Sequence, residues 1–182
     1  MTALPAPLTL KPHSHAQPVI AAADLSLPYR LLVTGWRDWP TDRQNTIYRT
    51  LDNILGSLLL GTGPPGVDLP PMWPHTAPTP ALIIMHGQSP LGGVDRYADE
   101  WARLQGDWVG VERHPPAVAQ FGAGPGRFLK RNSHMVARLR THITDGGYGS
   151  WAAFPGNSSG TIDCLTKAIR AGIPGTTIPY NE

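Results

Sequence analysis

Short apolar stretches that alternate with helical patterns constrain the fold of this chain more than any other feature of its sequence. These stretches are residues 29–34, 81–85, 108–112, 150–154 and 176–178. Continuous apolar runs of this length are typical of strands that are covered on both faces. The segments between them carry the periodicity of amphipathic helices. The resulting β-α-β-α-β-α-β-α-β order predicts an α/β fold with a parallel sheet and helices on both of its faces.

The helical segments carry their own start and burial signals. Thr41 and Gln44 fit a capping box, in which Thr41 is the N-cap of the first helix. The second helix is predicted to bury Leu104 near its end, and the third helix is predicted at about residues 127–140. The last helix is predicted at residues 161–171. Its predicted buried face consists of Ile162, Leu165, Ala168 and Ile169.

Proline divides the chain into regions. The 182 residues suit one domain, and the 20 prolines concentrate in particular stretches. Because such stretches cannot form long helices, we interpret residues 1–28 as a Pro-rich N-terminal arm and residues 61–80 as a Pro-rich insertion. A disordered tail is an equally good interpretation of the first stretch. The folded domain is predicted at residues 29–182.

Charge and cysteine content narrow the class of protein. The net charge of +2 does not by itself indicate a nucleic-acid or membrane partner. No apolar stretch approaches the roughly 20 residues that span a bilayer, and no signal peptide is predicted. Cys164 is the single cysteine, so a disulfide within the chain is excluded and a cytoplasmic location is expected. The histidines lack metal-ligand spacing, and we predict neither a metal nor a cofactor.

The loops that follow the predicted strands form the candidate site. In parallel sheets these loops meet at the carboxyl edge, where ligands bind. Here they are residues 34–38, 86–95, 122–131 and 155–163, all rich in Gly or polar residues. In the last loop, small residues lead directly into a helix, whose free backbone N–H groups suit a phosphate or another anion. An ordinary connection with a Ser N-cap is the alternative interpretation.

Motifs in these loops resemble those of a known family. They are Val33-Thr34-Gly35-Trp36-Arg37-Asp38, His86-Gly87, Gly92-Gly93-Val94-Asp95, Gly124-Pro125, Arg131-Asn132-x-x-Met135, and Pro155-Gly156-Asn157-Ser158-Ser159-Gly160-Thr161 with Asp163. Over about residues 30–179 the chain resembles the YspA-type branch of the SLOG superfamily, which joins the DNA-processing protein DprA and the LOG phosphoribohydrolases. The resemblance implies a Rossmann-like three-layer fold with a mainly parallel sheet of about five strands. It also implies a nucleotide or nucleotide-derived ligand at the carboxyl edge.

The resemblance further implies site residues. In LOG enzymes, which cleave the base from a nucleoside monophosphate, an upstream helix supplies an arginine and the glycine turn is followed by a glutamate. Arg131 resembles that arginine and Asp163 lies near that carboxylate, which makes both candidate catalytic residues, although the turn is one residue longer here. A solvated Arg131 and an Asp163 that only complements the helix dipole are the alternatives. The candidate ligand-binding residues are Thr34, Gly35, Arg37, Asp38, His86, Gly87, Gly92, Gly93, Asp95, Asn132, Gly156, Asn157, Ser158, Ser159, Gly160 and Thr161.

Other residues of these loops leave alternatives open. Asp95 either reaches a ribose hydroxyl or caps a helix, since it stands at a predicted helix start. Trp36 and Trp39 flank the first loop, where each either stacks on a base or covers the core. Cys164 is expected to be a small buried residue rather than a nucleophile.

The sequence supports three hypotheses for function. The first is a module that binds a nucleotide or nucleotide-derived ligand. The second is a phosphoribohydrolase-like N-glycosidase that acts on nucleoside monophosphates. The third is single-stranded nucleic-acid binding through the basic helix at about residues 127–140. Apart from Phe128, this stretch lacks the interleaved aromatic residues that are typical of such surfaces. A homo-oligomer, most simply a dimer, is expected from the resemblance.

Overall fold

The strands form one parallel sheet. The computed structural model describes residues 24–70, 77–89 and 92–180. The strand order is β3-β2-β1-β4-β5, and each of these neighbouring pairs is parallel. This arrangement confirms the predicted α/β Rossmann-like architecture with five strands. The strands are β1 (Tyr29–Gly35), β2 (Leu82–His86), β3 (Val109–Arg113), β4 (Gly149–Phe154) and β5 (Gly175–Thr177).

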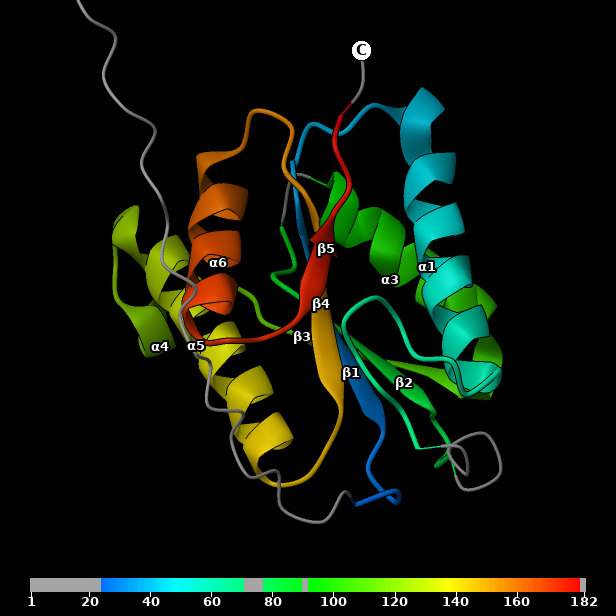
Figure 1. Cartoon of the computed structure of the whole chain (residues 1–182). Helices are drawn as coiled ribbons and strands as arrows, with labels where there is room; N and C mark the ends of the chain where they lie inside the picture. The colour runs from blue at the N-terminus through cyan, green and yellow to red at the C-terminus, as the bar shows by residue number, and fades with distance from the viewer. Residues whose placement is uncertain (1–23, 71–76, 90–91, 181–182) are drawn as a thin grey trace, which may run out of the picture.

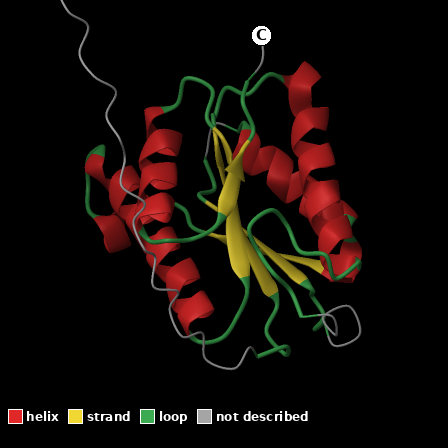
Figure 2. Cartoon of the chain, viewed as in Figure 1, coloured by secondary structure: helices red, strands yellow, loops and turns green. Residues whose placement is uncertain are grey.

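Helices cover both faces of the sheet and complete the three layers (Figures 1 and 2). One layer consists of α1 (Gln44–Leu59) and α3 (Val94–Leu104). The opposite layer consists of α5 (Gly126–Thr144) and α6 (Ser159–Arg170). A short helix that the sequence did not predict, α4 (Val118–Phe121), packs beside α5. The loops that follow β1 and β4 lie at the top of Figure 1, which is the carboxyl edge.

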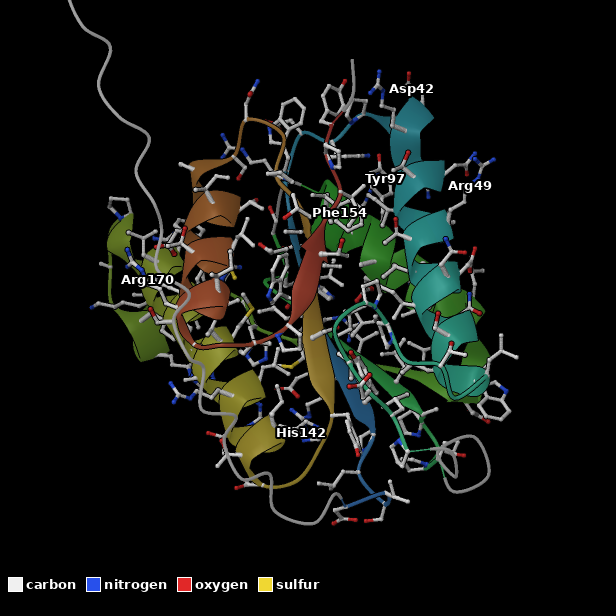
Figure 3. All side chains as sticks on the ribbon, in the orientation of Figure 1. Asp42, Arg49, Tyr97, His142, Phe154 and Arg170 are labelled. Atoms are coloured by element: carbon white, nitrogen blue, oxygen red, sulfur yellow. The ribbon has the colours of Figure 1, made fainter. Side chains whose placement is uncertain are left out.

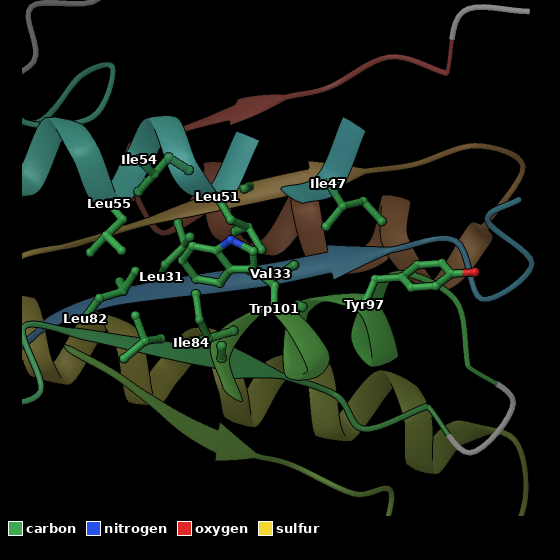
Figure 4. Close-up of a cluster of buried hydrophobic side chains, with 14 of the residues drawn as sticks. Leu31, Val33, Ile47, Leu51, Ile54, Leu55, Leu82, Ile84, Tyr97 and Trp101 are labelled. Carbon is green, nitrogen blue, oxygen red and sulfur yellow. The ribbon is translucent and has the colours of Figure 1, made fainter. Parts of the chain in front are cut away.

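The core between the sheet and α1 and α3 is built from alternating strand residues. Leu31 and Val33 of β1 face this layer and are fully buried. Figure 4 shows them against Trp101 of α3 and the buried apolar side chains of α1, which are Ile47, Leu51, Ile54 and Leu55. The Trp101 indole also donates a hydrogen bond of 2.8 Å to Asp52, so its polar group is satisfied. Complete burial of one such apolar side chain stabilises the fold by about 1.5–3 kcal/mol. In Figure 3, Phe154 lies inside the molecule, whereas Arg170 lies on its outer surface.

The second core lies between the sheet and α5 and α6. Leu32 and Met85, on the opposite face of their strands, pack here with Trp151 of β4. The helices contribute apolar or small side chains, among them Met135, Leu139, Cys164 and Ala168. The buried face of α6 therefore allows a close approach of this helix to the sheet.

The predicted buried face of α6 was wrong in part. Ile162 and Ile169 are 49% and 58% exposed. The stripe that faces the sheet instead passes through Thr161, Cys164 and Ala168. At about 100° per residue, this stripe turns both isoleucines outward. The larger apolar side chains misled the prediction, because small residues pack more closely against the sheet at this position.

Two predictions on the opposite layer were also wrong. Thr41 does not cap α1, because it lies in a 3-10 turn (Thr41–Arg43) and the helix begins at Gln44. The Thr41 hydroxyl instead accepts a hydrogen bond of 3.1 Å from the Tyr97 hydroxyl. Leu104 is 73% exposed, because it lies at the margin of the α3 stripe in the last turn of that helix.

The two Pro-rich regions are described only in part. Of the predicted arm, residues 24–28 form a turn anchored by a hydrogen bond from the Asp24 N–H to the Gly146 carbonyl. Residues 1–23, including its apolar patch, and residues 71–76 of the insertion lie outside the described residues. The described parts of residues 61–80 contain no helix or strand, as predicted. No helix in the described residues is long and apolar enough to cross a membrane.

Candidate functional site

A pocket of about 600 Å³ lies at the carboxyl edge of the sheet. The chain runs outward from β1 through β2 to β3, and then returns to β4 on the other side of β1. Ligands of open α/β sheets bind at this reversal. All four predicted loops contribute to the pocket. It is lined by Thr34, Gly35, Trp36, Arg37, Asp38, Gly87, Ser89, Asp95, Pro125, Gly126, Phe128, Leu129, Arg131, Met135, Asn157, Ser158, Ser159, Gly160 and Thr161.

The first turn of α6 forms one wall of this pocket. Ser158 is the N-cap, and its hydroxyl accepts a hydrogen bond of 3.3 Å from the Thr161 N–H. The first helical bond of this turn runs from the Ile162 N–H to the Ser158 carbonyl. The N–H groups of Ser159 and Gly160 therefore precede the helical ladder and have no intrahelical acceptor. Together with the positive end of the helix dipole, they form a surface that favours an anion.

The Arg131 guanidinium faces the same pocket from α5. Its Nη1 donates to the Gly87 carbonyl, and its Nε donates to Asn132 Oδ1 at 3.1 Å. Both partners are uncharged, so neither neutralises the cation. Burial lowers the pKa of Arg131 and the nearby Asp95 opposes this shift, but a guanidinium keeps its charge at physiological pH. The backbone carbonyl also fixes its position, and a side chain on Gly87 would collide with the guanidinium.

Asn132 joins Arg131 to the start of α6 and does not itself line the pocket. It is 1% exposed, and its amide nitrogen donates to the Gly160 carbonyl and to Asp163 Oδ2, both at 3.0 Å. Its amide oxygen accepts the bond from Arg131. One buried amide therefore positions both the Arg131 guanidinium and the first turn of α6.

Asp163 is directed toward α5 rather than into the pocket. Its Oδ2 accepts hydrogen bonds from Asn132 and from Lys167, the latter at 2.7 Å. The same lysine also donates to the Leu129 carbonyl at 2.8 Å. Asp163 is absent from the residues that line the pocket. The two candidate catalytic residues are thus separated: Arg131 faces the pocket, while Asp163 holds α6 against α5.

The carboxylate that the structure places in the wall of the pocket is Asp95. It is 8% exposed, and its Oδ2 accepts a hydrogen bond of 2.8 Å from the Ser89 N–H. Burial raises the pKa of Asp95, although the charges of His86 and Arg131 and the Ser89 bond act in the opposite direction. Asp95 therefore has an environment unlike that of a solvated carboxylate.

His86 supports this wall from behind. It is buried and does not line the pocket. Its Nδ1 accepts a hydrogen bond of 3.1 Å from the Gln88 N–H, which leaves Nε2 to donate to Asp99 Oδ1 at 3.2 Å. These two bonds fix the turn that carries Gly87 and Ser89, whose backbone groups hold Arg131 and Asp95. His86 is thus a positioning residue in this geometry.

Aromatic and apolar side chains complete the pocket. Trp36 lines it and packs against Gly156, where a side chain would collide with the indole. Trp39 is buried in the core, with its ring 5.6 Å from that of Phe154. Phe128, at the start of α5, also lines the pocket. Of the two roles that the sequence left open for these tryptophans, Trp36 therefore has a place in the pocket lining and Trp39 covers the core.

Glycines bring the first two loops together. Gly93 has φ of 68°, and a side chain there would collide with the Arg37 backbone. Only glycine meets both demands, since this φ is unfavourable for other residues. Arg37 and Asp38 line the pocket and pair with each other at 3.5 Å, with both side chains largely exposed.

The structure thus separates the candidate residues into two groups. Those that line the pocket are Thr34, Gly35, Arg37, Asp38, Gly87, Asp95, Arg131, Asn157, Ser158, Ser159, Gly160 and Thr161. Those that lie outside its lining are His86, Gly92, Gly93, Asn132, Gly156 and Asp163. Ser89, Phe128, Leu129 and Met135 were not among the candidates. Met135 belonged to one of the quoted motifs and Ser89 lies between the Gly87 and Gly92 turns, whereas Phe128 and Leu129 gave no signal, because apolar lining residues look like core residues.

Cys164 and the basic helix have local explanations. Cys164 is buried, and burial raises the pKa of its thiol to about 11, which disfavours the reactive thiolate. Among the cations of α5, Arg138 pairs with Glu112, which also pairs with Arg30 at 2.6 Å. Part of the positive charge of this helix is therefore neutralised.

The fold and the pocket define an α/β protein with a pocket of mixed polar and apolar lining at the reversal of strand order. Comparison of the chain with protein-family models, curated proteins and solved structures finds no match.

Proposed function

We propose that this protein binds a nucleotide or a nucleotide-derived ligand in the carboxyl-edge pocket. The observation that carries the proposal is the convergence of the α6 first turn and Arg131 on one cavity. Backbone N–H groups at a helix start and a guanidinium are two independent donors for phosphate oxygens.

The rest of the lining favours a nucleotide over a simple anion. Asp95 brings a buried carboxylate into the wall of the pocket, and this group would repel inorganic phosphate but accept a hydrogen bond from a sugar hydroxyl. Trp36 and Phe128 offer aromatic surface to a base. The cavity volume of about 600 Å³ is within the usual range for small-molecule sites.

The geometry favours binding over hydrolysis by Asp163. A carboxylate that stabilises a cation-like sugar must face that sugar. Asp163 is instead held by Asn132 and Lys167 outside the lining. The N-glycosidase hypothesis therefore gains no support from this residue, and the nucleic-acid hypothesis stays an untested prediction.

Isothermal titration against a panel of nucleoside monophosphates tests the proposal. We expect at least one nucleotide to bind, and Arg131→Met to weaken it by roughly tenfold or more through loss of a charge-assisted hydrogen bond. Arg140→Met is the matched control, since Arg140 is exposed on the same helix and outside the pocket lining. Its affinity should equal that of the wild type. No binding across the panel would refute the proposal, as would equal affinities of the two variants.

A further inference from the structure

Asp95 is buried at the pocket wall with only part of its hydrogen-bonding capacity used. Its Oδ2 accepts the Ser89 N–H, but within the described part of the chain Oδ1 has no hydrogen-bond donor. It does not cap α3 by a hydrogen bond either, because the N-cap of that helix is Gly93 and the bond that Asp95 accepts comes from Ser89, which lies before the helix. Helix capping, the alternative that the sequence left open, therefore does not explain this residue.

A carboxylate in this position is costly to the protein. The residue is 8% exposed, so its charge loses most of its hydration, while Oδ1 is not among the fully buried atoms and stays open to the pocket. In a pocket that attracts anions, its charge also opposes phosphate binding. Neither cost is needed to hold the turn at residues 86–89, because a neutral amide would accept the same Ser89 bond. A ligand group that donates a hydrogen bond would satisfy the open oxygen.

Charge proximity indicates which part of a nucleotide supplies this donor. Arg131 and Asp95 lie close enough for each to shift the pKa of the other. If Arg131 holds the phosphate, the group beside Asp95 is the one next to the phosphate, which is the sugar. The donors of that sugar are its 2′ and 3′ hydroxyls.

We propose that Asp95 accepts a hydrogen bond from a ribose hydroxyl and thereby selects ribonucleotides over deoxy analogues that lack this hydroxyl. This inference rests on the proposed function, because it requires a nucleotide in the pocket. Selection follows because a bound ligand covers the open oxygen and excludes water from it. A ligand that lacks the hydroxyl then leaves the covered carboxylate oxygen without a donor, and this loss exceeds the net contribution of an ordinary hydrogen bond.

The test compares the tightest-binding nucleoside monophosphate of the panel with its 2′-deoxy and 3′-deoxy analogues. For the wild type we expect at least one analogue to bind more weakly by roughly tenfold or more. In Asp95→Asn, the amide oxygen keeps the Ser89 bond and the NH₂ group replaces the open acceptor. The preference should then fall to within about threefold. Asp95→Ser provides a second variant, and circular dichroism reports whether each one is folded.

Asp38→Asn is the matched control. Asp38 is the other carboxylate of the pocket, but its side chain is 60% exposed and pairs with Arg37. Its replacement should leave the preference for ribonucleotides unchanged. Equal binding of ribo- and deoxyribonucleotides by the wild type would overturn this inference while nucleotide binding stands. So would a preference that survives in folded Asp95 variants or disappears in Asp38→Asn. Failure of every nucleotide to bind would instead remove the proposed function itself.

Discussion

Replacement of Asn132 by alanine should both destabilise the protein and weaken its ligand pocket. Asn132 is almost completely buried and makes three side-chain hydrogen bonds, to Arg131, the Gly160 carbonyl and Asp163. The bonds to Gly160 and Asp163 tie α5 to the first turn of α6, and the bond from Arg131 lies within α5. Alanine leaves all three partners without this contact.

The magnitude follows from the partners. A bond to a neutral carbonyl contributes about 1 kcal/mol, and each bond to a charged group contributes about 1.5–3 kcal/mol. Asp163 keeps its bond from Lys167 and Arg131 keeps its bond to Gly87, which reduces the loss. Alanine also has a higher helix propensity than asparagine, by less than about 0.7 kcal/mol. We therefore expect a net loss of about 3 kcal/mol in the free energy of unfolding.

Urea denaturation followed by circular dichroism measures this loss. Asn45→Ala is the matched control, because Asn45 is exposed on α1 and its replacement changes helix propensity alone. Under conditions where both proteins are folded, Asn132→Ala should also bind the nucleotide more weakly, whereas Asn45→Ala should bind as the wild type does. A difference in stability of less than about 1 kcal/mol between the variants would show that the hydrogen bonds of Asn132 do not hold the two helices together.

Three further predictions concern other parts of the site. Gly93→Ala should lower the free energy of unfolding, measured in urea, clearly more than Gly106→Ala does. Both glycines have positive φ, which costs about 1–2 kcal/mol for alanine. Of the two, Gly93 is the position where the added side chain would collide with backbone. Equal losses would contradict this. Burial raises the pKa of Asp95 above its ordinary value of 3.8, so the folded protein holds this proton more tightly than the unfolded chain does. The resulting contribution to the free energy of unfolding is present below pH 3.8 and is lost as the pH rises through the raised pKa. Asp95→Asn should therefore gain stability relative to the wild type between about pH 4 and pH 7, and a constant difference would argue against it. Cys164, with a thiol pKa of about 11, should react with iodoacetamide slowly in the native protein and rapidly in concentrated urea, as followed by mass spectrometry; equal rates would refute its burial.

The architecture could be predicted because the apolar stretches mark the strands and the order of strands and helices indicates how these strands pair. Each of the five apolar stretches overlaps a strand of the sheet, and the order of strands and helices is enough to predict parallel pairing. The faces of the helices were less predictable. On α6, Cys164 and Ala168 face the sheet while Ile162 points outward. Hydrophobicity alone favours the isoleucine, because it does not measure how closely a helix approaches the sheet.

The position of the site was predictable, but the directions of its side chains were not. The carboxyl-edge rule locates all four loops, and these loops line one pocket. Whether a side chain on α6 faces the pocket or α5 depends on its partners in other helices. Asn132 and Lys167 turn Asp163 toward α5, although neither contact follows from the spacing of a single motif. Likewise, the Ser89 backbone that holds Asp95 has no side-chain signature.

Asp95 and Asp163 show how hydrogen-bond satisfaction separates a functional role from a structural one. Asp163 accepts two bonds from its own chain and joins two helices, so its contacts account for its presence without any ligand. Asp95 is more deeply buried, has a raised pKa and retains an oxygen without a donor. Stability alone would favour a neutral residue at that position. Residues that lower stability in this way are expected at functional sites. The carboxylate that family resemblance indicated is therefore the one that the fold explains, and the carboxylate that the fold does not explain lies in the pocket.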